Sequence, residues 1–268
     1  MVNILKKNKI LITGSGSGLG KMAAISLAKR GHLVYASTFY ENQAEELNKY
    51  AKENNLNLIS FKLDIRDKID LEKLNTLDFD TLINNAAIGD SGSLSEVNIN
   101  RIKNVFNTNI FATLNITQLA IKKFIENKKG KVIFISSLSG RTAIKFLGPY
   151  CTTKFCLQGI AECLKKEMKM LEYADIKIKL IEPGAYATGF NKINTAKKYK
   201  WMEQKSYFKF RLDSLKENEE MTWNFLESKN FKPIIKQYVK AVEDNNYKFR
   251  YCRPLIQKFA IKLLLLFS

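Results

Sequence analysis

The chain has 268 residues, of which 46% are apolar and 26% are charged, and its formal net charge is +18. This length suits one extended α/β domain with a large buried core, and the composition is that of a globular protein, which excludes the disordered and membrane-spanning classes. The lysines are spread along the chain without a dense basic run interleaved with aromatic residues, so we expect no nucleic-acid partner and ascribe the charge to solvated faces.

The N-terminal sequence and the cysteines favour a cytoplasmic protein. The first ten residues carry lysines but neither an apolar run nor a cleavage site, so they are expected to begin the fold. Four cysteines lack metal-ligand spacing, and we expect reduced thiols and no metal site. These cysteines are Cys151, Cys156, Cys163 and Cys252.

Short apolar runs alternate with amphipathic segments through the first two thirds of the chain, which is the pattern of a doubly wound parallel sheet. The expected strands are residues 10–13, 33–36, 56–62, 81–84, 131–136 and 176–181, with a final one within 247–252. The expected helices are residues 19–29, 41–53, 101–127 and 152–171. The rhythm predicts right-handed crossovers, about seven strands, and helices on both faces of one domain spanning 1–268.

Residues 189–232, after the sixth expected strand, have no strand pattern and are rich in lysine and aromatic residues. Because ligands of a doubly wound sheet bind at the carboxyl ends of its strands, we predict that this segment is a lid over a substrate, in preference to a helical pair that only packs on the core. Its aromatic residues are Phe190, Tyr199, Trp201, Tyr207, Phe208 and Phe210.

The C-terminal segment 253–268 combines basic residues with a strongly apolar end. It is expected to form either a helix buried against the lid or a second subunit, which we favour, or a segment that lies on a membrane surface. No apolar stretch in the sequence is long enough to cross a bilayer.

A glycine-rich turn, Thr13-Gly-Ser-Gly-Ser-Gly-Leu-Gly20, joins the first strand to the first helix. Glycine permits positive φ angles and close backbone approach, and the N–H groups of the following helix can face a pyrophosphate. The residues expected to do so are Gly14, Ser15, Gly18, Leu19 and Gly20. Leu19 stands where the common G-x-G-x-x-G fingerprint needs its last glycine, so the spacing that fits is T-G-x-x-x-G-x-G.

This spacing resembles that of the short-chain dehydrogenase/reductase family, whose members bind NAD(P) on a Rossmann-like fold. Three further segments are similar to family motifs, and the resemblance implies that they contact the cofactor. Asp64 would contact adenine, and Asn85 and Ala86, within Asn84-Asn-Ala-Ala87, would lie along the cofactor, with Ala87 at the family's glycine. Pro183, Gly184 and Thr188 would hold the nicotinamide amide.

A Tyr150-x-x-x-Lys154 pair lies on a predicted helix, and the four-residue spacing places both side chains on one face. Ser137 precedes Tyr150 by thirteen residues, and Asn109 lies in the long helix before it. These residues resemble the family's catalytic tetrad of Asn, Ser, Tyr and Lys. The resemblance also implies that Lys154 binds the cofactor ribose and that Asn109 positions a water.

The chemistry of carbonyl reduction explains these residue types. A free tyrosine has a pKa near ~10, which is high for a base at neutral pH. A lysine ammonium about 5 Å away, at an effective dielectric of roughly 20, favours the phenolate by about 3 kcal/mol. Ser137 can donate a hydrogen bond to the substrate oxygen as charge develops there. We therefore expect Tyr150 to be the acid/base of an oxidoreductase that transfers hydride between a nicotinamide and a carbonyl/alcohol pair.

The end of the second strand bears on the choice between NAD and NADP. The expected 2′-hydroxyl position is Ser37, followed by Thr38, so the acid that repels a 2′-phosphate is missing. The basic residues that bind this phosphate in the family are missing too. We favour NADP(H) over NAD(H), with the two hydroxyls bonding the phosphate.

Two alternatives to an enzyme remain at this stage: a non-catalytic dinucleotide sensor and a membrane-peripheral binding protein on the same fold. The substrate is a small carbonyl or alcohol whose class stays open between sterol-like, fatty and small molecules. By resemblance, a homodimer or homotetramer is expected through the helices at 101–127 and 152–171.

Overall fold

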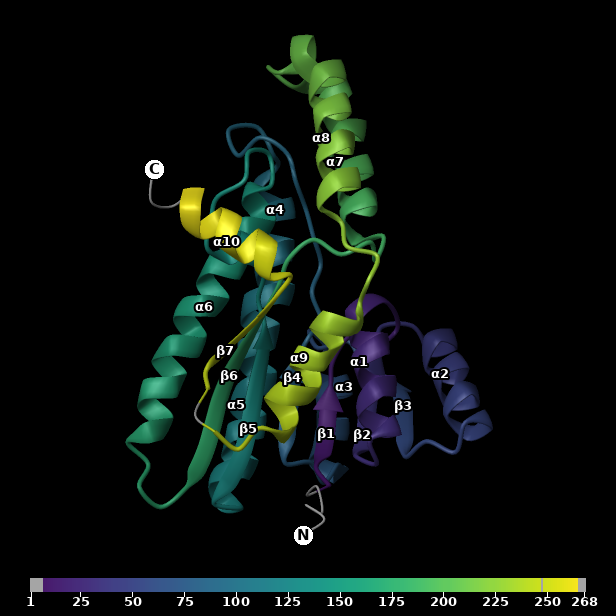
Figure 1. Cartoon of the computed structure of the whole chain (residues 1–268), viewed down its shortest axis with the longest axis vertical. Helices are drawn as coiled ribbons and strands as arrows, with labels where there is room; N and C mark the ends of the chain where they lie inside the picture. The colour runs from purple at the N-terminus through teal and green to yellow at the C-terminus, as the bar shows by residue number, and fades with distance from the viewer. Residues whose placement is uncertain (1–6, 247, 265–268) are drawn as a thin grey trace.

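Seven parallel strands form one sheet in the order β3-β2-β1-β4-β5-β6-β7, shown in the computed structural model of Figure 1. Residues 7–246 and 248–264 are described, with side chains as far as residue 260. The strands are β1 (Lys9–Ile12), β2 (Leu33–Thr38), β3 (Leu58–Lys62), β4 (Thr81–Asn84), β5 (Lys129–Ile135), β6 (Asp175–Pro183) and β7 (Arg250–Arg253). The predicted doubly wound sheet is confirmed.

The last strand is shorter than the segment expected for it, and Tyr247 lies outside the described residues, as do the first six residues and 265–268. The third strand begins at Leu58 instead of Leu56. Leu56 still belongs to the turn that ends the preceding helix, because its N–H donates to the Ala51 carbonyl and Asn55 has a positive φ.

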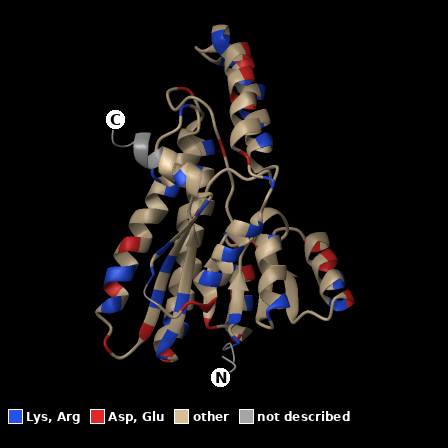
Figure 2. Ribbon diagram, in the orientation of Figure 1, with Lys and Arg blue, Asp and Glu red and all other residues tan. Residues whose placement is uncertain are grey.

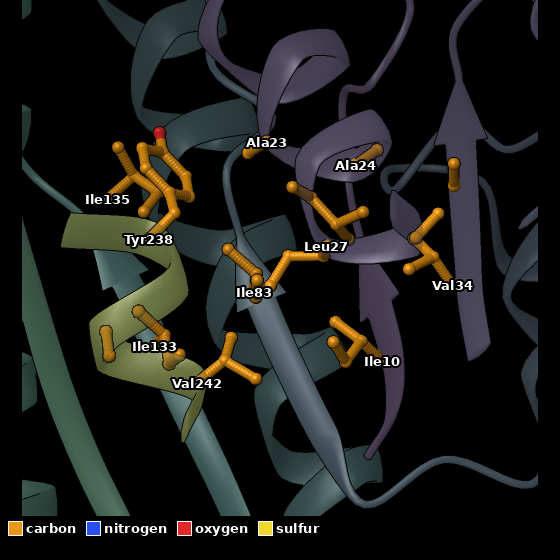
Figure 3. Packing of buried hydrophobic residues seen from close by; sticks show 14 of the residues in the cluster. Ile10, Ala23, Ala24, Leu27, Val34, Ile83, Ile133, Ile135, Tyr238 and Val242 are labelled. Carbon is orange, nitrogen blue, oxygen red and sulfur yellow. The ribbon is translucent and has the colours of Figure 1, made fainter. Parts of the chain in front are cut away.

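Helices cover both faces of the sheet. One face carries α1 (Gly18–Lys29), α2 (Glu41–Glu53) and α9 (Lys232–Glu243), and the other carries α5 (Thr113–Glu126) and α6 (Gly148–Lys169). Alternate residues of a strand point to opposite faces, so Ile10 and Ile12 pack on the first layer and Leu11 on the second. Figure 3 shows Leu27 of α1 and Tyr238 and Val242 of α9 packed over the central strands.

The expected helix 101–127 is interrupted, and several helices were not expected. A π-helical turn, η2 (Asn107–Ala112), separates α4 (Ile99–Phe106) from α5. Segment 189–232 folds into α7 (Phe190–Lys205) and α8 (Leu212–Leu226), an antiparallel hairpin that projects from the body at the top of Figure 1. The short helix α3 (Lys68–Glu72) and α10 (Leu255–Leu264) complete the fold.

Two buried lysines lie at the opposite end of the sheet from this hairpin, at the end of α9. Lys131 of β5 donates to the Val242 carbonyl, and Lys179 of β6 donates to the Asp244 carbonyl and lies 3.2 Å from the Tyr251 hydroxyl. Burial lowers the pKa of Lys131 to about 7 and that of Lys179 to about 8. Desolvation thus outweighs the attraction of the helix end for a cation.

Lys179→Met is expected to reduce the pH dependence of stability. The unfolded chain holds the Lys179 proton up to a pKa near ~10.4, whereas the folded chain releases it near pH 8, so stability rises with pH in between. From pH 7 to pH 9, the free energy of unfolding should rise by about 1 kcal/mol less in the variant than in the wild type. Urea denaturation at the two pH values measures this, and the exposed Lys166→Met is the control. Equal rises in Lys179→Met and the wild type would contradict the assignment.

Candidate active site

A cavity of about 1400 Å³ opens at the carboxyl ends of the central strands. Its floor is formed by the turn after β1 and by the ends of β4, β5 and β6, and its walls include residues of α7, α8 and α10. This is the edge at which doubly wound folds bind ligands. The described part of the chain contains no cluster of His, Cys, Asp or Glu that could hold a metal ion.

The glycine turn lines one end of the cavity. Gly14 has φ +68°, and a Cβ there would lie 2.7 Å from the Ala86 Cα. Gly20 faces the Asn85 amide and the Gly14 carbonyl, each 2.4 Å from where its Cβ would stand. Only glycine fits these two positions. The N-cap Ser17 makes no side-chain hydrogen bond to the first turn of α1, which contains no acid, so its N–H groups stay available for an anion.

Asn85 connects this turn to β4 and α9. Its amide nitrogen donates to the carbonyls of Thr13 (2.9 Å) and Gly14 (3.0 Å). Its amide oxygen accepts a hydrogen bond of 3.0 Å from the hydroxyl of Tyr238, a fully buried residue of α9. The Asn85 side chain that binds the turn is therefore held by a residue 153 positions further along the sequence.

Tyr150, Lys154 and Ser137 come together in this cavity. Tyr150 and Lys154 share one face of α6, with the Lys154 Nζ 5.4 Å from the centroid of the Tyr150 ring. Ser137, two residues after the end of β5, also lines the cavity and interacts with the Tyr150 hydroxyl. Neighbouring Ser136 points elsewhere: its hydroxyl donates to the Lys154 carbonyl at 3.0 Å.

Burial shifts the pKa values of both members of the Tyr–Lys pair. Desolvation raises the pKa of Tyr150 well above its ordinary value, an effect that Ser137 opposes. Desolvation also lowers the pKa of Lys154 to about 7. Lys154 can donate three hydrogen bonds, and the one described goes to the Ile135 carbonyl at 2.9 Å. Its two remaining donors fit a polyhydroxylated group such as a cofactor ribose.

Asn109 lies behind the cavity, in the π-helical turn η2, and does not line it. Its amide oxygen accepts from the Ile88 N–H, and its amide nitrogen donates to the Ile88 carbonyl, both at 2.9 Å, and to the Thr153 hydroxyl at 3.1 Å. The side chain thus joins η2, the segment after β4, and α6 next to Tyr150. Such π-turns are frequent at functional sites.

The structure corrects the expectation that Ser37 and Thr38, at the end of β2, bind the cofactor. The side chain of Ser37 is fully buried and does not line the cavity, and the Thr38 hydroxyl, also buried, donates to the Tyr40 carbonyl. These hydroxyls are therefore not placed to bond a 2′-phosphate, because β2 continues to Thr38 and both side chains are buried within the strand. Ser15 is likewise buried: its N–H donates to the Ser37 carbonyl and its hydroxyl to the Ile12 carbonyl.

One end of the cavity is lined by side chains from the segments after β2 and β3. They include Phe39, Gln43, Asp64 and Arg66. Arg66 binds both carboxylate oxygens of Asp64 at 2.7 to 3.2 Å, and its guanidinium lies 5.5 Å from the Phe39 ring centroid. The hydrogen bonds from Arg66 hold the pKa of Asp64 below its usual value. The carboxylate that would contact adenine is therefore ionised, and the guanidinium balances its charge.

Pro183, Gly184 and Thr188 line the cavity beside Ser137. The Gly184 N–H donates to the Arg253 carbonyl at 2.9 Å, and a Cβ at Gly184 would collide with Gln257 of α10. Leu19, Gly18 and Ala86 line the same cavity, as expected. Asn85, Ala86 and Thr188 thus face the glycine turn from the neighbouring strand ends.

The hairpin of α7 and α8 forms one wall of the cavity. Phe190 lies against Tyr150, with ring centroids 5.3 Å apart. Glu219 of α8 joins the two helices: it accepts from the Tyr199 hydroxyl at 2.7 Å and pairs with the buried Lys198. Of the other aromatic residues expected in the lid, Trp201 stacks with Arg101, Phe208 packs on Phe146, and Tyr207 and Phe210 are exposed.

Tyr238, Arg66 and Glu219 are site residues that the sequence did not reveal. Tyr238 and Glu219 lie in the last third of the chain, outside any motif, and only their contacts with Asn85 and with α7 give them a role. Arg66 had a signal, since it follows Asp64 by two residues at a strand end. Because the sequence has no basic residue beside Ser37, a cation at the end of the neighbouring strand, such as Arg66, could have been considered for the 2′-phosphate.

The fold and the cavity define a class of protein: an α/β fold with a dinucleotide-type glycine turn and a buried Tyr–Lys pair at the strand ends. A profile described as short chain dehydrogenase matches residues 8–198. The chain is 32% identical over 183 residues to 3-ketodihydrosphingosine reductase of Bacteroides thetaiotaomicron, a match that covers 68% of this chain and 65% of that protein. The chain therefore belongs to the short-chain dehydrogenase/reductase family, although it matches just under two thirds of that relative's length.

Two solved structures share the fold. A short chain dehydrogenase/reductase from Burkholderia phymatum in complex with NAD superposes with a TM-score of 0.79 at 17% identity, over 97% of this chain and 94% of that one. A variant of actinorhodin polyketide ketoreductase with NADPH gives a TM-score of 0.73 at 18% identity, over 91% and 96%. One of these structures is a complex with NAD and the other is a complex with NADPH.

Tyr238→Phe is expected to weaken dinucleotide binding. The variant removes the hydrogen bond that orients the Asn85 amide against the glycine turn, and a lost bond of about 1 kcal/mol corresponds to about a fivefold higher dissociation constant. Titration of the protein with NADPH and NADH by tryptophan fluorescence measures it. Tyr251→Phe, at the other end of the sheet, is the matched control, and equal binding by both variants would remove the role of Tyr238.

Proposed function

We propose that this protein is an NAD(P)-dependent oxidoreductase that interconverts a carbonyl and a secondary alcohol, with Tyr150 as the general acid/base. The observation that carries the proposal is the buried Tyr150 hydroxyl, next to Ser137 and Lys154, in the same cavity as the glycine turn. A non-catalytic dinucleotide sensor would need none of this arrangement, so we favour the enzyme.

The residues of the chain account for the proton chemistry of such a reaction. A bound nicotinamide would supply or accept the hydride. Tyr150, kept protonated by burial, donates its proton to the carbonyl oxygen during reduction, and Ser137 offers a second hydrogen bond to that oxygen. Lys154, when protonated, stabilises the resulting phenolate electrostatically. Asn109 holds α6 and the segment after β4 in register beside Tyr150.

Tyr150→Phe is expected to lower kcat by about 10³-fold, because no other acid replaces the phenol, while NADPH binding stays within about twofold. Nicotinamide absorbance measures turnover, with a long-chain and a short-chain 3-ketone as substrates, and fluorescence titration measures binding.

Tyr173→Phe removes an exposed phenol after the end of α6 and is the control, expected to match the wild type. Undiminished turnover by Tyr150→Phe would overturn the proposal. A wild-type protein that binds NADPH but turns over neither ketone would support the sensor instead.

The substrate that fits best is a ketone with a long apolar chain. Phe190 packs against Tyr150. The cavity lining also contains further apolar side chains beside polar and charged ones; the apolar ones are Ile88, Leu138, Ile144, Phe146, Leu147, Ile193 and Leu226. The name of the Bacteroides relative, 3-ketodihydrosphingosine reductase, supports this class. The long-chain ketone is therefore expected to be the better of the two test substrates.

The hairpin is proposed to act as the lid over this substrate, within a single domain that spans the chain. Phe190, Tyr199 and Trp223 of the hairpin face the same cavity as Tyr150. Gly189, at the start of α7, has φ +84° with open space around it, which suits a hinge.

NADP(H) is proposed as the preferred cofactor, now through Arg66 instead of Ser37 and Thr38. The segment after β2 lines one end of the cavity, and Arg66 is a cation at this end. Its partner Asp64 is the one carboxylate among the described residues that line this end. A 2′-phosphate would compete with Asp64 for the guanidinium.

The wild type is expected to bind NADPH more tightly than NADH, and Arg66→Gln to lower NADPH affinity about tenfold with little effect on NADH. Fluorescence titration with both cofactors measures the two constants. Lys68→Gln, an exposed cation two residues away that does not line the cavity, serves as the control. Tighter NADH binding by the wild type, or parallel losses for both cofactors in Arg66→Gln, would contradict the preference.

A homodimer or homotetramer and a cytoplasmic location also remain proposals. Exposed Phe111 and Phe155, on η2 and α6, support association through these helices. The four cysteines are free, which suits a reducing compartment. No helix in the described part of the chain is long and apolar enough to span a membrane.

A further inference from the structure

The described part of α10 turns its polar side inward and its apolar side outward. Gln257 faces the interior: its amide oxygen accepts from the Ala185 N–H at 2.8 Å, and its nitrogen donates to the Leu226 carbonyl at 2.7 Å. Ile256 and Phe259 face solvent with 83% and 63% of their surface exposed. Gln257 thus contacts the lid helix α8, as one of the sequence-based alternatives expected, whereas the lid does not cover Ile256 and Phe259.

The tip of the lid hairpin has a similar composition. Tyr207 and Phe210 are 76% and 81% exposed between α7 and α8. Lys209 and Arg211 flank Phe210, and the structure gives neither an ion-pair partner among the described residues. Aromatic rings alternating with basic side chains suit the boundary between lipid headgroups and acyl chains.

The two elements lie at the same end of the molecule and border the same cavity. Figure 1 shows the hairpin and α10 at the end towards which the strands point. Gln257 and Ala260 of α10 line the cavity together with Trp223 and Leu226 of α8. The hairpin and α10 thus both border the cavity, and both carry exposed apolar side chains.

We propose that this end of the molecule, formed by the hairpin tip (Tyr207, Lys209, Phe210, Arg211) and the outer face of α10 (Ile256, Lys258, Phe259), docks on the surface of a membrane that contains anionic lipids. The proposal concerns a surface and does not depend on the proposed activity.

Charge selects the membrane over a second copy of the chain. The chain carries a formal net charge of +18, and basic residues lie at the hairpin tip in Figure 2. Two copies meeting at this surface would bring like charges together, whereas an anionic surface attracts Lys209, Arg211 and Lys258. The sequence continues past Phe259 with Ile261 and, after Lys262, four leucines and a phenylalanine, which extends the apolar composition.

The experiment is co-sedimentation of the full chain with phosphatidylcholine vesicles, with and without about 30% phosphatidylserine, at about 0.1 M salt. The wild type is expected to bind the anionic vesicles and to bind neutral vesicles at least about tenfold more weakly. Two double variants should each bind anionic vesicles about tenfold more weakly. They are Ile256→Ser with Phe259→Ser, and Lys209→Gln with Arg211→Gln.

The matched control is Met170→Ser with Tyr173→Ser, which removes two exposed apolar side chains just after α6, at the other end of the molecule. It should bind like the wild type. The proposal would be overturned if all three variants bound equally or if the wild type did not bind anionic vesicles. It would also be overturned if light scattering showed a change from dimer to monomer in Ile256→Ser with Phe259→Ser. Turnover of a water-soluble ketone by the same preparations reports separately on the proposed activity.

Discussion

The burial of a lysine beneath a tyrosine is the constraint on which the site depends. Lys154 is almost fully enclosed where α6 crosses the end of β5, with its Nζ on the Ile135 carbonyl and its own carbonyl on the Ser136 hydroxyl. These two bonds fix α6 against the sheet, and the same turn of α6 carries Tyr150. A buried cation is costly unless it is hydrogen-bonded or can release its proton. Lys154 donates a hydrogen bond to the Ile135 carbonyl, and its lowered pKa of about 7 allows it to lose its proton near neutral pH.

The surrounding structure holds this pair and the glycine turn in fixed relative positions. Asn85 lies between them, since its backbone follows β4 and its amide binds the turn. Tyr238 supports Asn85 from α9, and Asn109 supports the neighbouring segment from η2. Polar side chains that are fully hydrogen-bonded in this way specify one arrangement, because any other would leave a buried group without a partner.

The cavity extends from the glycine turn past Tyr150 to the lid. The Asp64–Arg66 pair lines the end formed by the segments after β2 and β3, whereas the hairpin contributes apolar side chains together with Lys197, Lys198 and Glu219. Under the proposed function, a dinucleotide and a ketone would meet at the Tyr150 hydroxyl.

The sequence by itself determined the features that depend on neighbours in the chain. Short continuous apolar runs predicted the central strands, and glycine spacing predicted the turn. The four-residue spacing of Tyr150 and Lys154 predicted one helix face, because such features follow from local backbone geometry. Only the tertiary structure decided which side chains reach the cavity. Ser37 was expected at a strand end but lies buried within β2, and Tyr238 binds Asn85, which lies 153 residues away in sequence. Such contacts depend on the packing of distant elements, and no local pattern encodes them.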